Sequence, residues 1–334
     1  MKEQKQKVAV VGVGQNATNS YLPWLARQKD LEILLFDTLP ERSAAAAQKF
    51  EARAFESLES LAAAAPDTAL VLTRETVRYE VSRQLLDLQI PRLFFEKPLV
   101  ARNGQAHVDE EDFALGRDLL SRAAEQGCET AMMFNYRFFE QTLRAKKMRE
   151  ERKLGQLIQV SGWINFACWS HAIDLIHAFG GDVSRISASS GETVREGAGN
   201  RSPDIAVAFS LAGGGAGTLV GSANEHTIYP FFHLTLAFEG GRLTFTGLDG
   251  DLEFYDYALS VYERYAVSRQ WSRWDLYNQS FAKALAAYLE SITARQPPPV
   301  PGLAGLKELQ FEAGVRKSLR TGAAVCPAAD FPCK

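Results

Sequence analysis

A lysine in the first third of the chain follows a run of residues that is too apolar for a protein surface. Residues 93–95, Leu-Phe-Phe, have the composition of a buried parallel strand, and Glu96 and Lys97 come directly after them. A parallel strand delivers its next residues to the carboxyl edge of the sheet, where open α/β sheets bind ligands. Desolvation there would lower the pKa of a lysine from about 10 toward the range useful for proton transfer. The sequence therefore indicates Lys97 as an acid/base group, with a solvated surface lysine as the alternative.

A glycine-containing turn near the N-terminus has the spacing of a phosphate-binding loop. The short β-branched strand at residues 8–11 runs into Gly12, Gly14 and Ala17, which form a G-x-G-x-x-A pattern. Gly12 permits the tight turn, and Gly14 allows the backbone to approach a pyrophosphate. Ala17 is small enough for the following helix to pack on the strand. The strand before the pattern and the helix after it favour a dinucleotide site over a chance match.

The next apolar strand, residues 33–36, ends at an acidic residue. Asp37 lies 25 residues after Gly12 (37 − 12), a distance that suits the carboxylate receiving the adenosine ribose hydroxyls of a dinucleotide. A cap for the helix that begins near Pro40 is the alternative. We expect NAD(H) to be preferred over NADP(H), because Asp37 would repel a 2′-phosphate. Arg42 weakens this expectation, since it is close enough to pair with that phosphate.

The order of the predicted elements divides the chain into two parts. In the first part, strands at residues 8–11, 33–36, 69–72 and 93–95 alternate with helices, which indicates right-handed crossovers and a parallel sheet. After residue 157 the strands follow one another, which indicates an α+β domain with a large, mostly antiparallel sheet. We therefore predict a Rossmann dinucleotide-binding domain at residues 1–125. We predict an α+β substrate-binding and oligomerisation domain at residues 126–334, whose last helix, 304–320, could pack back on the first domain.

Composition argues against several classes of protein. The chain has 334 residues, of which 46% are hydrophobic and 23% charged, values typical of a globular protein with more than one domain. The net charge of −3 argues against nucleic acid or an anionic membrane as the main partner. The start of the chain lacks the apolar core of a signal peptide, and no stretch approaches the ~20 apolar residues of a membrane span. The four cysteines are scattered, so we expect a reduced, cytoplasmic protein.

A second candidate group lies in an apolar segment of the second part. His171 is surrounded by apolar neighbours, which predicts a buried helix that starts near Ser170 as its N-cap. His171 and Asp174 are three residues apart and share one helix face, so the carboxylate can orient or polarise the imidazole. A structural histidine–aspartate pair in the core is the alternative. The five histidines show no metal-ligand spacing, and we predict no metal site.

Five short motifs follow one another along nearly the whole chain: Glu96-Lys97-Pro98, Arg137-Phe138, LGQLIQV at 154–160, His171-Ala172-Ile173-Asp174, and EGGRL at 239–243. Together they resemble the Gfo/Idh/MocA family of NAD(P)-dependent oxidoreductases. The resemblance implies a nicotinamide between the Rossmann edge and the second sheet, and hydride transfer at a sugar, polyol or inositol carbon. It further implies that Lys97 lies at the nicotinamide before a cis Pro98, that His171 is the catalytic histidine, and that Thr73 and Glu96 are cofactor contacts.

The chain departs from the family pattern at two informative positions. Ala167 stands where many members have an aspartate that binds the substrate hydroxyl, and Arg78 stands where a histidine is frequent. We predict an oxidoreductase that interconverts an alcohol and a ketone of a sugar, sugar derivative or polyol. Lys97 would be the principal acid/base group, His171 its partner at the substrate oxygen and Asp174 the orienter of the imidazole.

Two alternatives stay open at this point. The missing aspartate is consistent with a catalytically silent, dinucleotide-binding regulator or sensor, and some distant relatives perform nicotinamide-assisted elimination at a glycoside. Under the preferred interpretation the partners are NAD, or NADP, and a small carbohydrate-like substrate. A sheet face that the helices leave uncovered would expose a large apolar patch, so we also expect a homodimer or homotetramer.

Overall fold

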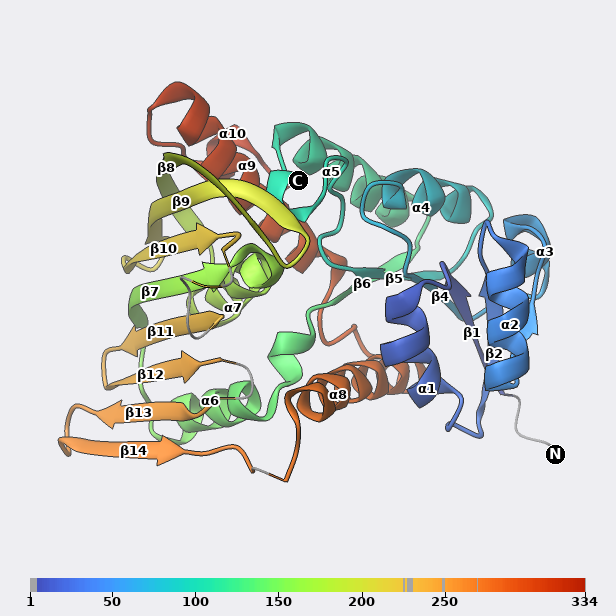
Figure 1. Cartoon of the computed structure of the whole chain (residues 1–334), viewed down its shortest axis with the longest axis horizontal. Helices are drawn as coiled ribbons and strands as arrows, with labels where there is room; N and C mark the ends of the chain where they lie inside the picture. Colours follow the sequence, from blue (N-terminus) through green and yellow to red (C-terminus); the bar gives the residue numbers. More distant parts are fainter. Residues whose placement is uncertain (1–4, 225, 227–230, 248–249, 269, 334) are drawn as a thin grey trace. The chain divides into compact units, whose positions relative to one another are not determined.

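The computed structural model describes residues 5–224, 226, 231–247, 250–268 and 270–333. The chain forms two compact units, each with its own sheet (Figure 1). The first unit comprises residues 1–102, 114–133 and 281–306, and the second comprises residues 103–113, 134–280 and 307–334. The chain therefore passes between the units several times. The sequence predicts one boundary, near residue 125, between two parts that each fold independently. This boundary stays a prediction.

The first unit is built on a six-stranded parallel sheet, as the alternation of strands and helices predicts. Its strands, in the spatial order β3-β2-β1-β4-β5-β6, are β1 (Gln6–Val11), β2 (Leu31–Phe36), β3 (Arg53–Ala54), β4 (Thr68–Val71), β5 (Arg92–Glu96) and β6 (Glu129–Met133). The chain order reverses between β1 and β4, and such a switch point is where open α/β sheets bind ligands. β1, β4 and β5 are almost fully buried, which is why they are continuous apolar runs in the sequence.

Helices complete the first unit. They are the π-helix η1 (Ala17–Tyr21), α1 (Leu22–Leu25), α2 (Pro40–Phe50), α3 (Leu58–Ala63), α4 (Arg78–Asp87), most of α5 (Glu110–Glu125) and the C-terminal part of α8 (Arg273–Thr293). α8 is anchored to this sheet through Tyr288, whose hydroxyl lies 2.7 Å from that of Thr68 and whose ring packs on Phe94. A segment distant in sequence thus covers the first sheet, a contact that strand and helix patterns do not reveal.

The second unit contains the large, mostly antiparallel sheet that the sequence predicts. Its strands, in the spatial order β14-β13-β12-β11-β7-β10-β9-β8, are β7 (Leu157–Asn165), β8 (Val183–Gly197), β9 (Asn200–Leu211), β10 (Ala216–Ser222), β11 (Phe232–Phe238), β12 (Gly241–Thr246), β13 (Leu252–Asp256) and β14 (Val261–Tyr265). β7 and β10 pair in parallel, whereas the other neighbours are antiparallel.

The helical segments of the second unit are η2 (Gln105–His107), η3 (Asn135–Phe138), α6 (Glu140–Glu151), η4 (Phe166–Cys168), α7 (Trp169–Gly180), most of α9 (Gly302–Thr321) and α10 (Pro327–Asp330). α7 packs on the inner face of the sheet beside β7 (Figure 1). The prediction that Ser170 caps this helix is wrong, because α7 already begins at Trp169. The side-chain cap belongs instead to Asn165, whose Oδ1 accepts the Ala167 N–H over 2.9 Å at the start of η4.

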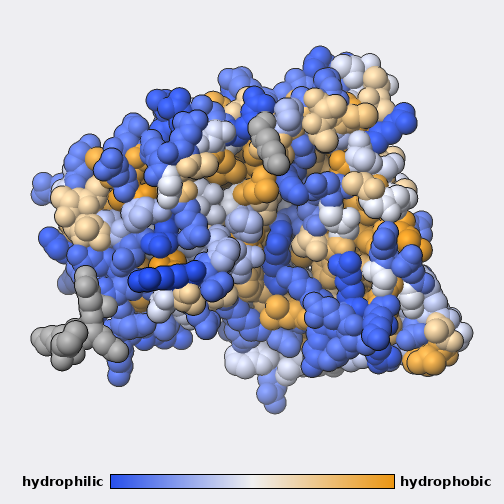
Figure 2. Space-filling view, turned by 180° about the vertical axis from the view of Figure 1, so that it is seen from behind, coloured by the Kyte–Doolittle hydropathy of each residue, from blue (hydrophilic) through white to orange (hydrophobic). Residues whose placement is uncertain are grey.

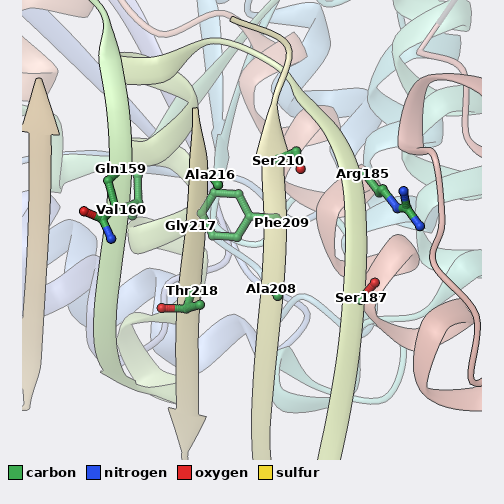
Figure 3. Close-up of a pocket in the computed structure, with 10 residues that line it drawn as sticks. All are labelled: Gln159, Val160, Arg185, Ser187, Ala208, Phe209, Ser210, Ala216, Gly217 and Thr218. Carbon is green, nitrogen blue, oxygen red and sulfur yellow. The ribbon is translucent and has the colours of Figure 1, made fainter. Parts of the chain in front are cut away.

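The large sheet exposes both polar and apolar side chains. A hollow of about 490 Å³ on this sheet is lined by Gln159, Arg185, Ser187 and Thr218 and by apolar residues such as Phe209 (Figure 3). Large apolar side chains on the strands of this sheet are also exposed, namely Ile158, Trp163, Val194, Val261 and Tyr262. The apolar patch and the homodimer or homotetramer expected from it stay predictions.

Hydrophobic residues are scattered among hydrophilic ones over the surface seen in Figure 2. Among the described residues, no helix is long and apolar enough to cross a membrane.

Candidate functional site

The turn after β1 has the geometry of a dinucleotide-binding loop. Gly12 has φ +94°, and a Cβ on it would lie 2.7 Å from the backbone nitrogen of Thr73, so a larger residue would displace the end of β4. A Cβ on Gly14 would meet no atom within 4 Å, so the backbone is open to a ligand there. Ala17 is buried where η1 begins, as its small size predicts. These positions fit the backbone approach that a pyrophosphate needs.

The carboxylate of Asp37 is held beside this turn. Oδ2 accepts the Val13 N–H over 2.7 Å, and Oδ1 accepts the Leu39 N–H over 3.0 Å. An ionised carboxylate has about four acceptor sites, so two remain for ribose hydroxyls. Asp37 therefore faces the glycine turn, and its bond to Leu39 fixes the residue before α2 without capping the helix, which has no side-chain cap. Arg42 is exposed in the first turn of α2, and its contact with a cofactor stays a prediction.

Thr73 offers an unused hydrogen-bonding group beside Gly12. Its Oγ1 is buried and has no hydrogen-bond partner among the described residues. Buried hydroxyls are almost always paired, so a polar group of a ligand would complete this one. The turn at Gly12 and Gly14, the carboxylate of Asp37 and the hydroxyl of Thr73 together fit a dinucleotide such as NAD.

Glu96 fixes the backbone where β5 ends. Its Oε1 accepts hydrogen bonds from the Tyr21 hydroxyl over 2.5 Å and from Asn16 Nδ2 over 2.7 Å. Its Oε2 accepts the Lys97 N–H over 3.0 Å. Glu96 thus ties the first helical turn after the glycine loop to the residue that carries the candidate acid/base group. Its predicted contact with the cofactor remains untested.

Lys97 is half-buried and precedes a cis peptide bond to Pro98, as the resemblance implies. A residue that the sequence did not assign to the site holds this loop. Arg78 is 2% exposed and donates from Nη1 to the carbonyl oxygens of Glu96, over 2.7 Å, and of Pro98. Its Nη2 donates to the carbonyl oxygen of Thr73 over 2.8 Å. Burial lowers the pKa of Arg78, and the nearby charge of Glu96 opposes this effect.

In the second unit, His171 lies in an aromatic cluster. It is 2% exposed, and the ring of Tyr136 stacks on its imidazole with centroids 3.7 Å apart and planes 7° apart. Phe134 contacts the same imidazole edge to face at 5.9 Å. The Tyr136 hydroxyl lies 3.0 Å from Cys168 Sγ, and burial together with this cysteine raises the pKa of Tyr136 well above 10. The cluster therefore fixes the plane of the imidazole.

Asp174 has a partner that the sequence did not assign to it. Arg137 donates from Nε to Oδ2 over 2.7 Å and from Nη2 to Oδ1 over 2.5 Å, a bidentate ion pair. Burial raises the pKa of Asp174, and the charge of Arg137 opposes that shift. The predicted action of Asp174 on His171 is untested. Among the described residues, no group of three or more histidine, cysteine or acidic side chains could hold a metal ion.

Comparison with known proteins finds a family match for the N-terminal part of the chain. Residues 6–130 match the sequence model of the Gfo/Idh/MocA group, described as an oxidoreductase family with an NAD-binding Rossmann fold. None of the curated proteins is similar enough in sequence to be matched.

Solved structures show the same fold over nearly the whole chain. An oxidoreductase from Agrobacterium radiobacter, in complex with NAD+, L-tartaric acid and magnesium, has a TM-score of 0.81 and 14% identity, covering 98% of this chain and 100% of its own. UDP-N-acetylglucosamine 3-dehydrogenase GnnA from Acidithiobacillus ferrooxidans has a TM-score of 0.75 and 18% identity, covering 94% and 98%. A super-repressor mutant of Gal80p from Saccharomyces cerevisiae has a TM-score of 0.80 and 17% identity, covering 97% and 98%.

Proposed function

We propose that the chain, whose residues 6–130 match the sequence model of the Gfo/Idh/MocA oxidoreductases, belongs to this family and transfers a hydride between NAD(H) and a carbon of a sugar, sugar derivative or polyol. The observation that carries this proposal is the placement of Lys97. It follows a buried parallel strand at the carboxyl edge of the NAD-binding sheet, and Arg78 and Glu96 fix the backbone on either side of it. The bound dinucleotide supplies or takes up the hydride.

The protein's own residues would handle the proton that accompanies this hydride. Lys97 Nζ is the principal acid/base group, which gives a proton to the substrate oxygen on reduction and takes it back on oxidation. His171 is the second acid/base group of this proposal, and Tyr136 fixes the plane of its imidazole by stacking. Asp174, neutralised by Arg137, would influence the imidazole through its position one helical turn further along α7.

A regulator of the same fold is the second candidate function. Ala167 supplies only a methyl group where many family members have an aspartate for the substrate hydroxyl, and the fold is also that of the repressor Gal80p. The two candidates predict different behaviour once a dinucleotide is bound. An enzyme oxidises NADH with at least one keto-sugar, whereas a regulator binds the dinucleotide without turnover.

The test is a turnover assay of the purified protein, monitored at the nicotinamide absorbance, across sugars, sugar nucleotides, polyols and their keto forms. Lys97→Met should lower turnover at least 10²-fold, the lower limit for positioned acid/base catalysis. It should leave NADH affinity nearly unchanged, because the glycine turn and Asp37 lie elsewhere in the unit. Lys29→Met, at an exposed lysine of the same unit, is the matched control and should keep full turnover.

Two results would contradict the enzymatic proposal. Tight NADH binding without turnover of any compound in the panel would favour the regulator. Turnover by Lys97→Met above about a tenth of that of the wild type would remove the lysine from the mechanism.

A further inference from the structure

The helical turn that follows the glycine loop is a π-helix, and it places a buried tyrosine at the end of β5. The Leu22 N–H donates to the carbonyl oxygen of Ala17, five residues back, so η1 holds one residue more than an α-helical turn. Tyr21, the last residue of η1, is fully buried, and its ring contacts Phe281 edge to face, with centroids 5.2 Å apart. Its hydroxyl donates to Glu96 Oε1 over 2.5 Å. This turn therefore brings a phenol hydroxyl to a buried carboxylate, and π-helical turns are frequent at functional sites.

Asn16 connects the same carboxylate to the glycine loop. Its Nδ2 donates to Glu96 Oε1 over 2.7 Å. Hydrogen bonds also close the loop around it: the Thr18 N–H donates to the Gly14 carbonyl oxygen over 3.0 Å, and the Thr18 hydroxyl donates to the carbonyl oxygens of Gly14 and Gln15 over 3.2 Å and 3.1 Å. A pyrophosphate that contacts the backbone at Gly14 therefore acts on the segment that carries Asn16.

The two oxygens of Glu96 have donors from different segments of the chain. Oε1 accepts from Tyr21 and Asn16, and Oε2 accepts the Lys97 N–H over 3.0 Å. Glu96 is 7% exposed, so it depends on these donors in place of water. Both oxygens are bonded to one carbon, and a shift of Oε1 therefore moves Oε2. The donors at Oε1 thus set the position of the group that accepts the Lys97 N–H.

The backbone of Lys97 is held from two directions. Arg78 binds the carbonyl oxygens of the residues before and after it and joins them to the end of β4. The Glu96 carboxylate binds the Lys97 N–H and joins it to the glycine loop. The second connection runs from the loop that a pyrophosphate approaches to the candidate acid/base group. Occupation of the dinucleotide site can therefore influence Lys97 through side chains of the first unit alone.

We propose that Asn16 and Tyr21 are positioning residues, which couple occupation of the dinucleotide site to the position of Lys97 through the Glu96 carboxylate. Contact between the dinucleotide and the glycine loop fixes Asn16 and the turn that carries Tyr21. Their hydrogen bonds then hold Glu96 in the position in which it accepts the Lys97 N–H. The inference requires the dinucleotide site but not turnover, so it goes beyond the proposed function and can be tested without it.

The test measures hydrogen exchange of the Lys97 amide, because this amide is the donor to Glu96 Oε2. Exchange is followed on the full-length protein by mass spectrometry, with electron-transfer fragmentation of a peptide that covers residues 92–98. Each protein is measured without NAD+ and with NAD+ at a concentration that saturates it. The variants are Asn16→Ala and Tyr21→Phe, and the second keeps the ring that packs on Phe281.

Each variant has a matched control in the same unit. Asn19→Ala replaces an exposed asparagine of η1, and Tyr79→Phe removes a hydroxyl that donates to Asp118 over 2.6 Å. Both controls should follow the wild type.

NAD+ should slow exchange of the Lys97 amide about ten-fold in the wild type, within the range of about 5- to 150-fold that is typical of coupled sites. In Asn16→Ala and in Tyr21→Phe, NAD+ should slow this exchange by less than about three-fold, because the connection to Glu96 is broken. The inference is overturned if NAD+ leaves the wild-type amide unchanged. It is also overturned if either variant keeps the full slowing, since the dinucleotide would then protect Lys97 without Asn16 or Tyr21.

Exchange and turnover separate this inference from the proposed function. Coupled exchange without turnover of any sugar would support the positioning role and contradict the enzyme. Turnover that requires Lys97, together with exchange that NAD+ does not change, would support the enzyme and overturn the inference. Where the protein is an enzyme, Tyr21→Phe at saturating NAD+ should lower kcat at least about five-fold while KM for the substrate changes less, a split that a purely structural role of the hydroxyl would not produce.

Discussion

Arg78 donates a hydrogen bond to the carbonyl oxygen of Glu96 and thereby holds the backbone immediately before Lys97. The same guanidinium reaches the carbonyl oxygens of Thr73 and Pro98, so the ends of β4 and β5 are joined through one buried side chain. Three acceptors in different directions match the planar fork of a guanidinium, which a lysine ammonium cannot reproduce. Arg78 is therefore a positioning residue for the candidate acid/base group.

Arg78→Lys should lower both stability and turnover. Each buried carbonyl left without a donor costs about 1–3 kcal/mol, so we expect a loss of about 2–4 kcal/mol in the free energy of unfolding, measured by urea denaturation. Turnover should fall at least ten-fold while KM changes less, because the lysine loop loses its support and the substrate contacts do not. Arg83→Lys, at a partly exposed position of the same helix, should change the free energy of unfolding by less than about 0.5 kcal/mol. Equal losses of stability and turnover in Arg78→Lys and Arg83→Lys would show that Arg78 does not position Lys97.

Cofactor preference tests the arrangement around Asp37. The carboxylate is fixed by the Val13 and Leu39 amides, so it cannot turn away from a ribose 2′-phosphate without losing both bonds. We expect NADH to bind more tightly than NADPH, and Asp37→Ser to reduce the ratio of the two dissociation constants at least ten-fold. Arg42→Ala should leave NADH binding unchanged. Tighter binding of NADPH by the wild type would mean that Arg42 outweighs Asp37.

The sequence predicted the secondary structure best where it is strongly periodic. Both sheets follow from their apolar strands, but β8 and β14 do not, because β8 carries polar residues at most of its 15 positions and β14 is largely exposed. α5 was also not predicted, although its hydrophobic residues recur with helical spacing. β8 and β14 are stabilised by pairing with neighbouring strands rather than by burial, and such pairing leaves no periodic pattern of apolar residues in the sequence.

The residues of the candidate site were likewise predictable only in part. Gly12, Gly14 and Asp37 were predictable because their spacing follows from a local strand–turn–helix geometry. Arg78 binds a carbonyl oxygen as far as 20 positions away, at Pro98, and Tyr136 stacks on His171, which is 171 − 136 = 35 positions away. An arginine on a helix is ordinarily exposed, so its sequence position alone does not indicate burial. The departure of Arg78 from the family pattern was the available signal.

Removing only one partner of the Arg137–Asp174 ion pair should lower the free energy of unfolding markedly. Asp174 is 1% exposed, and removing its charge would leave a largely buried guanidinium without its bidentate acceptor. Asp174→Asn should therefore reduce the free energy of unfolding by about 3–5 kcal/mol. The double variant Arg137→Met/Asp174→Leu should lose less than either single variant, because it leaves no uncompensated charge. Losses that simply add would show that the two side chains do not act as a pair in solution.

Two groups of the second unit, the buried Glu312 and the partly buried His177, should give the protein opposing responses to pH. Glu312 is 3% exposed, and burial raises its pKa from 4.5 to about 7, against the opposing effects of Arg316 and a hydrogen bond with Trp169. Burial, with Lys307 as a smaller cause, lowers the pKa of His177 from 6.5 to about 4. Both groups change protonation on unfolding at mildly acidic pH.

The signs of the two contributions are opposite. Between pH 4.5 and 7, folded Glu312 retains a proton that the unfolded chain has released, so its contribution to stability is complete below pH 4.5 and is lost as the pH rises through 7. Between pH 4 and 6.5, unfolded His177 binds a proton that the folded protein does not, so this contribution is lost as the pH falls through 4. Over pH 4.5 to 6.5 the two slopes, each at most about 1.4 kcal/mol per pH unit, nearly cancel.

Single variants should therefore show the pH dependence of the free energy of unfolding that nearly cancels in the wild type. Relative to the wild type, the free energy of unfolding of Glu312→Gln should increase with pH across this window, and that of His177→Gln should decrease. Urea denaturation at three pH values within the window measures both trends, and Glu192→Gln, at an exposed position of β8, should follow the wild type. Parallel curves for Glu312→Gln and the wild type would mean that burial does not raise the pKa of Glu312 in the folded protein.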